Sequence, residues 1–172
     1  MSRKDERTLV LVRHGKAVPK DVDEDFDRAL ADRGRHDAPE AGQWLAASGV
    51  RADLALCSPS RRTRQTWQLM VPQLSEPPPT TYEDRLYKTG PDELRAALAE
   101  TDDGVAGLVL VGHNPGIHEL ARTLCGDGPK HLVRRIHDGF PTAAVVVLEL
   151  AGSWKSLTAG AGRPTAIWAP GD

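Results

Sequence analysis

Short apolar runs alternate with longer amphipathic segments along the chain. Thr8 to Val12 is a continuous run of aliphatic and β-branched residues, which is typical of a strand buried on both faces. Further strands are predicted at 53–57, 105–111 and 143–150, with a terminal antiparallel pair at 154–158 and 165–168. Helices are predicted at 38–47, 60–74, 92–100 and 115–125. This alternation predicts an α/β fold with strands that are mostly parallel.

The size and charge of the chain restrict the classes of protein to which it can belong. Its 172 residues predict one domain over residues 1–172. It has 22 Lys and Arg and 24 Asp and Glu, and the resulting charge of −2 argues against general binding to nucleic acid or to an anionic membrane. Two cysteines, Cys57 and Cys125, are too few for a disulfide framework or a four-ligand zinc site. The charged amino-terminal segment and the lack of a long apolar run lead us to expect a cytoplasmic protein.

Polar residues follow three of the predicted strands, at the point where each strand ends. Arg13-His14-Gly15-Lys16 follows the first strand, residues 58–66 follow the second, and residues 112–116 follow the third. Because ligands bind at the carboxyl ends of the strands in open α/β sheets, we expect two histidines and several arginines to meet at one edge. Guanidinium groups, imidazoles and helix N-termini together favour a dianion of the size of phosphate.

Each of these clusters also has an ordinary structural explanation. A histidine after a strand is commonly a hydrogen-bonding loop residue, and the arginines at 61–64 would suit a solvated helix face. Ser58 and Asn114 are good caps for helices that begin at Pro59 and Pro115, whether or not a site is present. The occurrence of all three clusters in order, each at a strand end, favours a functional site.

The three clusters resemble the motifs of the histidine phosphatase superfamily, and most closely those of its small SixA-type members, the phosphohistidine phosphatases. The matching segments are Arg13-His14-Gly15, Ser58-Pro59-x-x-Arg62-x-x-Gln65-Thr66 and Gly112-His113-Asn114-Pro115. Leu30 to Gly34 also resembles the family's turn before its first long helix, and the resemblance extends from about Thr8 to Trp168. It implies a phosphoglycerate mutase-like fold, which is a three-layer α/β/α sandwich with a mostly parallel central sheet and antiparallel strands near the C-terminus.

The resemblance implies catalysis through a phosphohistidine enzyme intermediate. His14 would be the nucleophile and would attack phosphorus through an unprotonated ring nitrogen. Arg13, Arg62 and His113 would hold the phosphoryl oxygens and stabilise charge in the transition state. A nucleophilic imidazole has to be neutral, and we expect the charges of Arg13 and Arg62 to lower the pKa of His14. No metal and no organic cofactor is implied.

The proton donor is the point at which the sequence departs from the family's pattern. Many relatives use a glutamate before a hydrophobic residue, and others use an aspartate directly after the second histidine, where this chain has Asn114. Glu83 is the remaining candidate, and an exposed loop carboxylate is the alternative role for it. A leaving nitrogen can depart without a strong enzyme acid, which suits phosphohistidine better than a phosphate ester. Lys16 is expected either to touch substrate or to be simply exposed.

The expected substrate is phosphohistidine in a protein, or a small phosphorylated molecule. The alternatives are a broad-specificity phosphomonoesterase or mutase-like enzyme acting on small phosphorylated metabolites, and a non-catalytic phosphoprotein-binding module. A mutase usually has longer insertions, and a binding module would be expected to lack His14 or an arginine. Specificity is expected to lie in the acidic loop at 17–30 and in the loop at 126–140. The chain has little length to spare for a lid, so we expect an open site that suits a protein substrate, and we leave the oligomeric state open.

Overall fold

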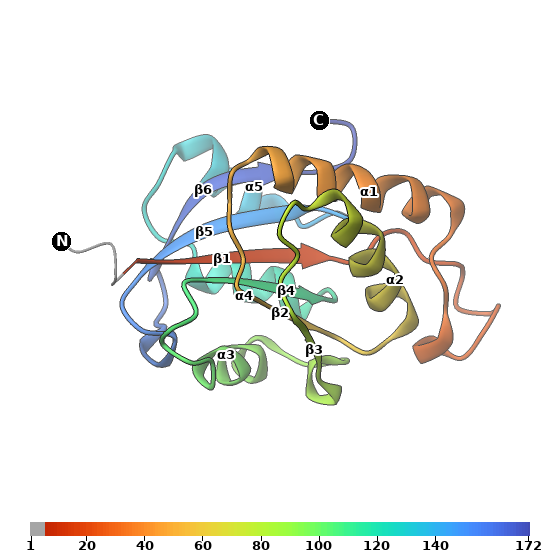
Figure 1. Ribbon diagram of the computed structural model, residues 1–172, viewed down its shortest axis with the longest axis horizontal. Coiled ribbons are helices and arrows are strands. Elements are labelled where there is room, and N and C mark those ends of the chain that lie inside the picture. The colour runs from red at the N-terminus through yellow and green to blue at the C-terminus, as the bar shows by residue number, and fades with distance from the viewer. Residues whose placement is uncertain (1–5) are drawn as a thin grey trace.

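One six-stranded sheet with helices on both faces makes up the computed structural model, which describes residues 6–172 (Figure 1). The strands are β1 (Glu6–Arg13), β2 (Leu54–Cys57), β3 (Thr80–Tyr82), β4 (Gly107–Gly112), β5 (Val145–Ala151) and β6 (Gly162–Trp168). The helices are α1 (Asp32–Ala47), α2 (Arg61–Met70), α3 (Pro91–Ala99), α4 (Gly116–Leu124) and α5 (Lys130–Asp138). Short 3-10 turns are η2 (Asp25–Asp27), η3 (Val71–Gln73), η4 (Asp84–Leu86) and η5 (Trp154–Ser156).

The strands lie in the order β3-β2-β4-β1-β5-β6. β1, β2, β3 and β4 pair with one another in parallel, β5 is antiparallel to β1, and β6 is antiparallel to β5. The prediction of a mostly parallel sheet with antiparallel strands near the C-terminus is therefore confirmed. Because β1, β2 and β4 run side by side in one direction, the residues that follow them all lie at one edge of the sheet.

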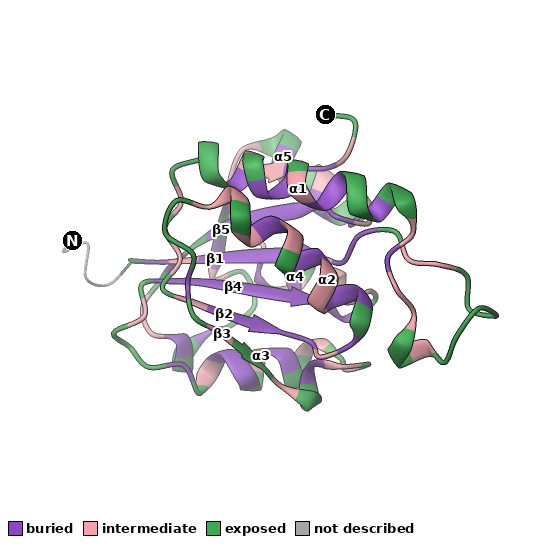
Figure 2. Ribbon diagram, turned by 45° about the vertical axis from the view of Figure 1, so that its right-hand side comes forward, coloured by how far each residue is buried: buried purple, intermediate pink, exposed green. Residues whose placement is uncertain are grey.

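The two faces of β1 contact different helices. Leu9 and Leu11 pack in one apolar cluster with residues of α3, α4 and α5, whereas Val10 and Val12 pack in a second cluster with residues of α1 and α2. Successive side chains of a strand point to opposite faces, so a continuous apolar run is what a sheet covered on both sides requires. Figure 2 shows the result, with buried strands between helices that are buried on their inner sides and exposed on their outer sides. The molecule is therefore a three-layer α/β/α sandwich, as predicted.

Several predicted boundaries are wrong. α1 begins at Asp32 rather than at residue 38, so Pro39 lies within the helix instead of near its start. Residues 154–158 do not form a strand with the C-terminal segment, because 154–156 form η5 and β6 pairs with β5 instead. The predicted loop at 126–140 contains α5, whose buried Leu132 and Ile136 have the spacing of one helix face.

Two glycines bring α1 against the end of β1. A Cβ on Gly34 would lie 2.3 Å from the carbonyl oxygen of Lys16, and a Cβ on Gly15 would lie 3.1 Å from the Cα of Gly34. The first distance is impossible without movement of the backbone, and the second is a tight contact that would require a shift of a few tenths of an ångström. This contact explains why a glycine follows His14 and why another glycine occurs near the start of α1.

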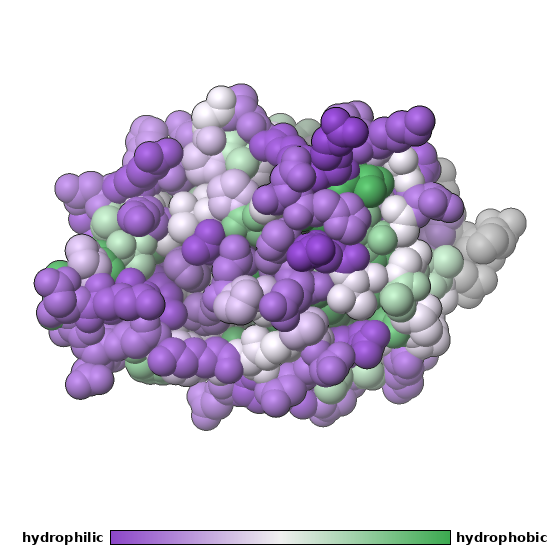
Figure 3. All heavy atoms as spheres, turned by 180° about the vertical axis from the view of Figure 1, so that it is seen from behind, coloured by the Kyte–Doolittle hydropathy of each residue, from purple (hydrophilic) through white to green (hydrophobic). Residues whose placement is uncertain are grey.

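The face opposite to the view of Figure 1 is mostly polar. Seen from behind, the surface is mainly hydrophilic, with small and separate hydrophobic areas (Figure 3). Among the helices that the structure describes, none combines the length and the apolar character that crossing a bilayer would need.

Candidate active site

His14 follows β1 and lies at the floor of a cavity at the carboxyl edge of the sheet. His14 is only 8% exposed, and its Nδ1 atom lies 2.7 Å from the carbonyl oxygen of Gly15. A carbonyl oxygen can only accept a hydrogen bond, so Nδ1 carries the proton and Nε2 has the free lone pair. The amide of Gly15 in turn donates to the hydroxyl of Thr66 at 2.9 Å, which connects the first motif to the second.

The imidazole of His14 is held in its neutral form. Burial is the main cause, and the nearby charges of Arg62 and Arg13 add to it, so that the pKa of His14 falls to about 3 despite the opposing hydrogen bond to Gly15. The expectation that the arginines lower this pKa has the right direction. Burial has the larger effect, however, and only the tertiary structure gives it. A neutral ring with a free Nε2 is what a nucleophilic histidine requires.

His113 lies beside His14, with the two ring centroids 5.4 Å apart. Arg62 donates from one terminal nitrogen to Nδ1 of His113 at 3.2 Å, so Nε2 carries the proton and donates to the hydroxyl oxygen of Ser58 at 2.7 Å. Burial, followed by the charges of His14 and Arg62, lowers the pKa of His113 to about 3. The second and third sequence motifs are thus joined through Arg62 and Ser58.

The two predicted arginines present donors that lack partners. Within residues 6–172, the buried Nε atoms of Arg13 and Arg62 make no hydrogen bond. Arg13 donates from another nitrogen to the carbonyl oxygen of Phe140 at 3.0 Å, and Asn114 donates to the same oxygen at 2.9 Å. These two Nε atoms are closed off from the cavity, so it is the positive charge of the two lining guanidinium groups that favours an anion there.

The cavity that contains these groups has a volume of about 580 Å³. Arg13, His14, Arg62 and His113 all line it, so the structure brings the four predicted residues together. Lys16 also lines the cavity and is exposed. The other charged side chains around the cavity are Lys20, Asp25, Arg28, Lys88 and Glu119.

Other predicted residues lie elsewhere. The carboxylate of Glu83 is 3.0 Å from Nε of Arg85, and Glu83 is not among the residues that line the cavity. Arg61 and Arg64 do not line it either. Cys57 is fully buried in the core, and burial raises the pKa of its thiol, in agreement with a structural role.

The sequence analysis placed specificity in the acidic loop at 17–30 but did not single out the residues on the outer side of the cavity. Asp25 and Arg28 come from the loop between β1 and α1, which extends away from the edge of the sheet at the right of Figure 1. Tyr87 directly follows η4 and donates a hydrogen bond to the carboxylate of Asp25. Asp25 and Arg28 have the i,i+3 spacing of an ion pair, which was a usable signal. Nothing in the sequence near Tyr87 connects it to that loop.

The predicted helix caps are also wrong, for a reason that concerns the site. α2 begins at Arg61 and α4 begins at Gly116, and neither is capped by the side chain of Ser58 or Asn114. Instead, the Ser58 hydroxyl accepts from His113, and the Asn114 amide binds the carbonyl of Phe140. Both side chains therefore hold site residues in place.

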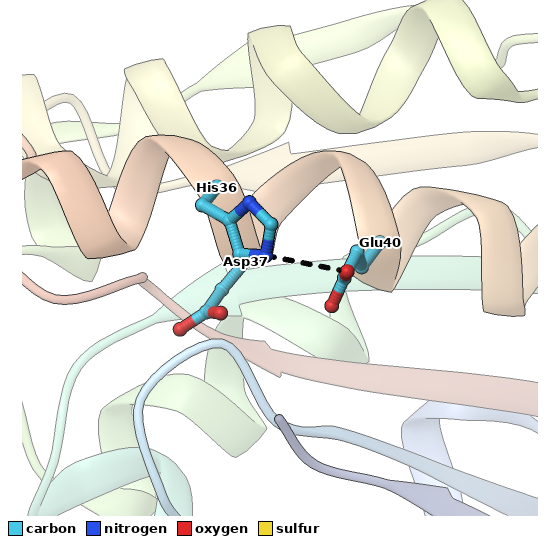
Figure 4. A group of neighbouring side chains, drawn as sticks. All are labelled: His36, Asp37 and Glu40. Carbon is cyan, nitrogen blue, oxygen red and sulfur yellow. Dashed lines mark ion pairs between the residues drawn. The ribbon is translucent and has the colours of Figure 1, made fainter. Parts of the chain in front are cut away.

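A second group of titratable side chains lies on α1 and is shown in Figure 4. Nε2 of His36 and a carboxylate oxygen of Glu40 are 3.4 Å apart, whereas the carboxylate of Asp37 turns away from this pair. Asp37 is instead paired with Arg33, at 3.5 Å. We interpret the group as ion pairs along a helix face rather than as a metal site.

Comparison with known proteins identifies the family. Residues 9–89 match the model of the histidine phosphatase superfamily (branch 1), a segment that includes Arg13, His14 and Arg62. An uncharacterized protein of Mycobacterium tuberculosis is 36% identical over 151 residues, which is 87% of this chain and 93% of that protein. A structure from Nakamurella multipartitia, assigned as the phosphohistidine phosphatase SixA, superposes with a TM-score of 0.85 and 29% identity over 97% of this chain and 98% of that one. The chain belongs to the histidine phosphatase superfamily. It is a phosphatase of the SixA type.

Two further relatives differ in how much of their length this chain covers. The 2,3-bisphosphoglycerate-dependent phosphoglycerate mutase of Brucella ovis is 33% identical over 135 residues, which is 77% of this chain but only 57% of the mutase. The protein histidine phosphatase SixA complexed with tungstate is 25% identical, with a TM-score of 0.76 over 95% of this chain and 97% of that one.

Proposed function

We propose that this phosphatase acts through a phosphohistidine intermediate on His14 and that its substrate is phosphohistidine in a protein. The proposal rests on the protonation and orientation of the His14 ring. The neutral ring is fixed by the hydrogen bond from Nδ1 to Gly15, and Nε2 is left for a cavity that Arg13 and Arg62 line.

In the first half-reaction the phosphoryl group would be bound by Arg13, Arg62 and His113. The lone pair of Nε2 of His14 forms the N–P bond while the bond from phosphorus to the leaving atom breaks, and the leaving atom keeps that electron pair. A phosphoryl group beside His113 would raise the pKa of that ring and favour protonation at Nδ1. The hydrogen bond from Arg62 to Nδ1 would then break, and the new Nδ1–H group would donate to a phosphoryl oxygen. The fixed positive charges of the arginines stabilise the transition state.

In the second half-reaction a water molecule would attack the phosphorus atom of phosphorylated His14. The new O–P bond forms as the N–P bond breaks, and the electron pair returns to Nε2. The attacking water loses a proton to solvent, and inorganic phosphate leaves. The site then returns to the neutral imidazole with which it began.

The carboxyl groups of the cavity favour a nitrogen leaving group. Asp25 and Glu119 are the carboxylates among the lining residues, and Glu119 is exposed. Partial burial would raise the pKa of Asp25, but hydrogen bonds from Tyr87 and Arg28 and the charge of Arg62 hold it well below its usual range. Asp25 is therefore ionised and cannot protonate a leaving alkoxide. The ring of phosphohistidine, once protonated, leaves as neutral imidazole and needs no such acid.

The direct test compares a phosphohistidine-containing protein with p-nitrophenyl phosphate as substrates. We expect a higher kcat/KM for the phosphohistidine protein. His14→Ala should lose about a thousand-fold or more in turnover, whereas His131→Ala, in an exposed position on α5, should stay within about two-fold of the unmodified enzyme. A preference for the ester would instead support a phosphomonoesterase. Full turnover by His14→Ala would contradict the mechanism.

A further inference from the structure

The loop between β1 and α1 places a carboxylate among the cations of the phosphatase site. Oδ1 of Asp25 accepts from Arg28 at 3.1 and 3.0 Å, and Oδ2 accepts from Arg62 at 3.2 Å and from the hydroxyl of Tyr87. The ammonium group of Lys88 is 3.7 Å from the same oxygen. Asp25 is thus an anion held at a fixed position in a cavity that otherwise attracts anions.

Asp25 also holds the guanidinium group of Arg62 in position. The backbone carbonyl of Asp25 accepts from one terminal nitrogen of Arg62 at 2.6 Å, and its carboxylate accepts from the other. That second nitrogen also donates to His113. Both terminal nitrogens of Arg62 are thus held by Asp25 and His113, and Asp25 fixes the position of this cation beside the nucleophile.

The position of Asp25 relative to the nucleophile shows which part of a substrate it would meet. His14 and Arg62 are 8% and 4% exposed, whereas the side chains of Asp25 and Lys88 are 27% and 63% exposed. The nucleophile therefore lies at the floor and Asp25 nearer the mouth. In an in-line displacement the leaving group departs on the side opposite the nucleophile, which is here toward the mouth.

An aromatic row leads along the same path. The ring of His113 lies 5.5 Å from that of Tyr87, and Tyr87 lies edge-to-face with Phe26 at 5.1 Å. Phe26 is 39% exposed, so the row extends from the site to the surface. Arg62 and Lys88 lie over the ring of Tyr87 at 5.9 and 5.5 Å, so the row holds these cations and the Asp25 loop beside the site.

We propose that Asp25 is the residue that selects the leaving group, favouring a nitrogen that departs from a protonated ring over an oxygen that departs as an anion. The inference rests on the proposed function and extends it to a residue outside the sequence motifs. The N–P bond breaks with its electron pair going to the ring nitrogen, so a protonated ring becomes neutral. An ester oxygen takes the pair as a negative charge, which Asp25 disfavours.

The ratio of two specificity constants tests this proposal. Both substrates share the phosphoryl group, so a loss of Arg62 positioning would lower kcat/KM for both by the same factor. A charge that acts on the leaving group changes their ratio. We would measure kcat/KM for one phosphohistidine peptide and for p-nitrophenyl phosphate. The proteins compared are the unmodified enzyme, Asp25→Asn, Asp25→Glu and the neighbouring control Asp27→Asn.

We expect the ratio of phosphohistidine to ester to fall by about ten-fold or more in Asp25→Asn and to change less than about two-fold in Asp27→Asn. Asp25→Glu retains the negative charge, so this variant should retain the ratio even if both activities decline. If Asp25→Asn does not fold, the ratio measured for Asp25→Glu still tests the proposal. An equal loss of both activities in Asp25→Asn would overturn the proposal, as would a fall of the ratio in Asp25→Glu. If the unmodified enzyme does not hydrolyse the peptide, the proposed function fails instead.

Discussion

Arg62 donates a hydrogen bond to Nδ1 of His113 at 3.2 Å, and this single contact connects two of the three sequence motifs. It fixes the proton of His113 on Nε2, where Ser58 accepts it. The same nitrogen of Arg62 also binds the carboxylate of Asp25. The planar guanidinium group of Arg62, on α2, therefore links His113 to the loop after β1.

Replacing Arg62 by lysine would keep the charge but remove this planar geometry. A lysine has one nitrogen and cannot bind Asp25, His113 and a phosphoryl oxygen in fixed directions. We expect kcat for a phosphohistidine protein to fall by about a hundred-fold, in line with the loss of one oriented donor. Arg61→Lys, next to it but outside the cavity, is the control and should remain within about two-fold. A mild effect of Arg62→Lys would mean that charge alone is sufficient.

The two site histidines predict how stability depends on pH. Their folded-state pKa values of about 3 lie below the ordinary value of 6.5, so the unfolded chain takes up protons first as the pH falls. The contribution of these groups to stability is complete above about pH 6.5 and is lost toward pH 3. The free energy of unfolding should therefore decrease between pH 6.5 and 4.5, by up to about 1.4 kcal/mol per pH unit for each histidine.

Urea unfolding at a series of pH values measures this slope. His14→Asn removes one titrating group and should reduce the slope over that interval by about half. His131→Asn, in an exposed position, should leave it unchanged. A slope that is the same in His14→Asn and in the unmodified protein would mean that His14 is not held neutral.

Much of the site could be predicted because its residues directly follow strands. Arg13, His14 and His113 adjoin apolar runs whose burial the sequence shows, and parallel strands bring their ends to one edge. Asp25 and Tyr87 could not be found in this way. Asp25 lies in a loop without periodicity, Tyr87 follows a short 3-10 turn, and their contact is purely tertiary. The functions of Ser58 and Asn114 were missed for a related reason. Their positions in the sequence favour helix capping, whereas in the structure their side chains bind His113 and the carbonyl oxygen of Phe140.

The contact between Gly34 and Lys16 predicts a local loss of stability. A methyl group on Gly34 would overlap a backbone oxygen 2.3 Å away, so α1 would have to move from the end of β1. We expect Gly34→Ala to destabilise the protein by about 1–3 kcal/mol, the usual cost of overpacking, and to lower Tm by several degrees. Gly139→Ala is the control, because nothing lies within 4 Å of its Cβ position. A Tm for Gly34→Ala equal to that of the control would contradict this packing.

The position of Glu83 predicts that it is not the proton donor. Its carboxylate is paired with Arg85 rather than directed into the cavity. We expect Glu83→Gln to change turnover of both phosphohistidine and p-nitrophenyl phosphate by less than about two-fold. A selective loss of ester turnover would restore Glu83 as the acid that a phosphate ester needs.

Transfer of the phosphoryl group through Nε2 of His14 is tested most directly by trapping the intermediate. The enzyme would be mixed with a labelled phosphodonor, quenched in base and analysed by fragmentation mass spectrometry to locate the phosphoryl group. We predict an acid-labile, base-stable phosphoryl group on His14 that is absent from His14→Ala and unchanged in His131→Ala. A phosphoryl group on any other residue, or turnover by His14→Ala at the rate of the unmodified enzyme, would contradict the account.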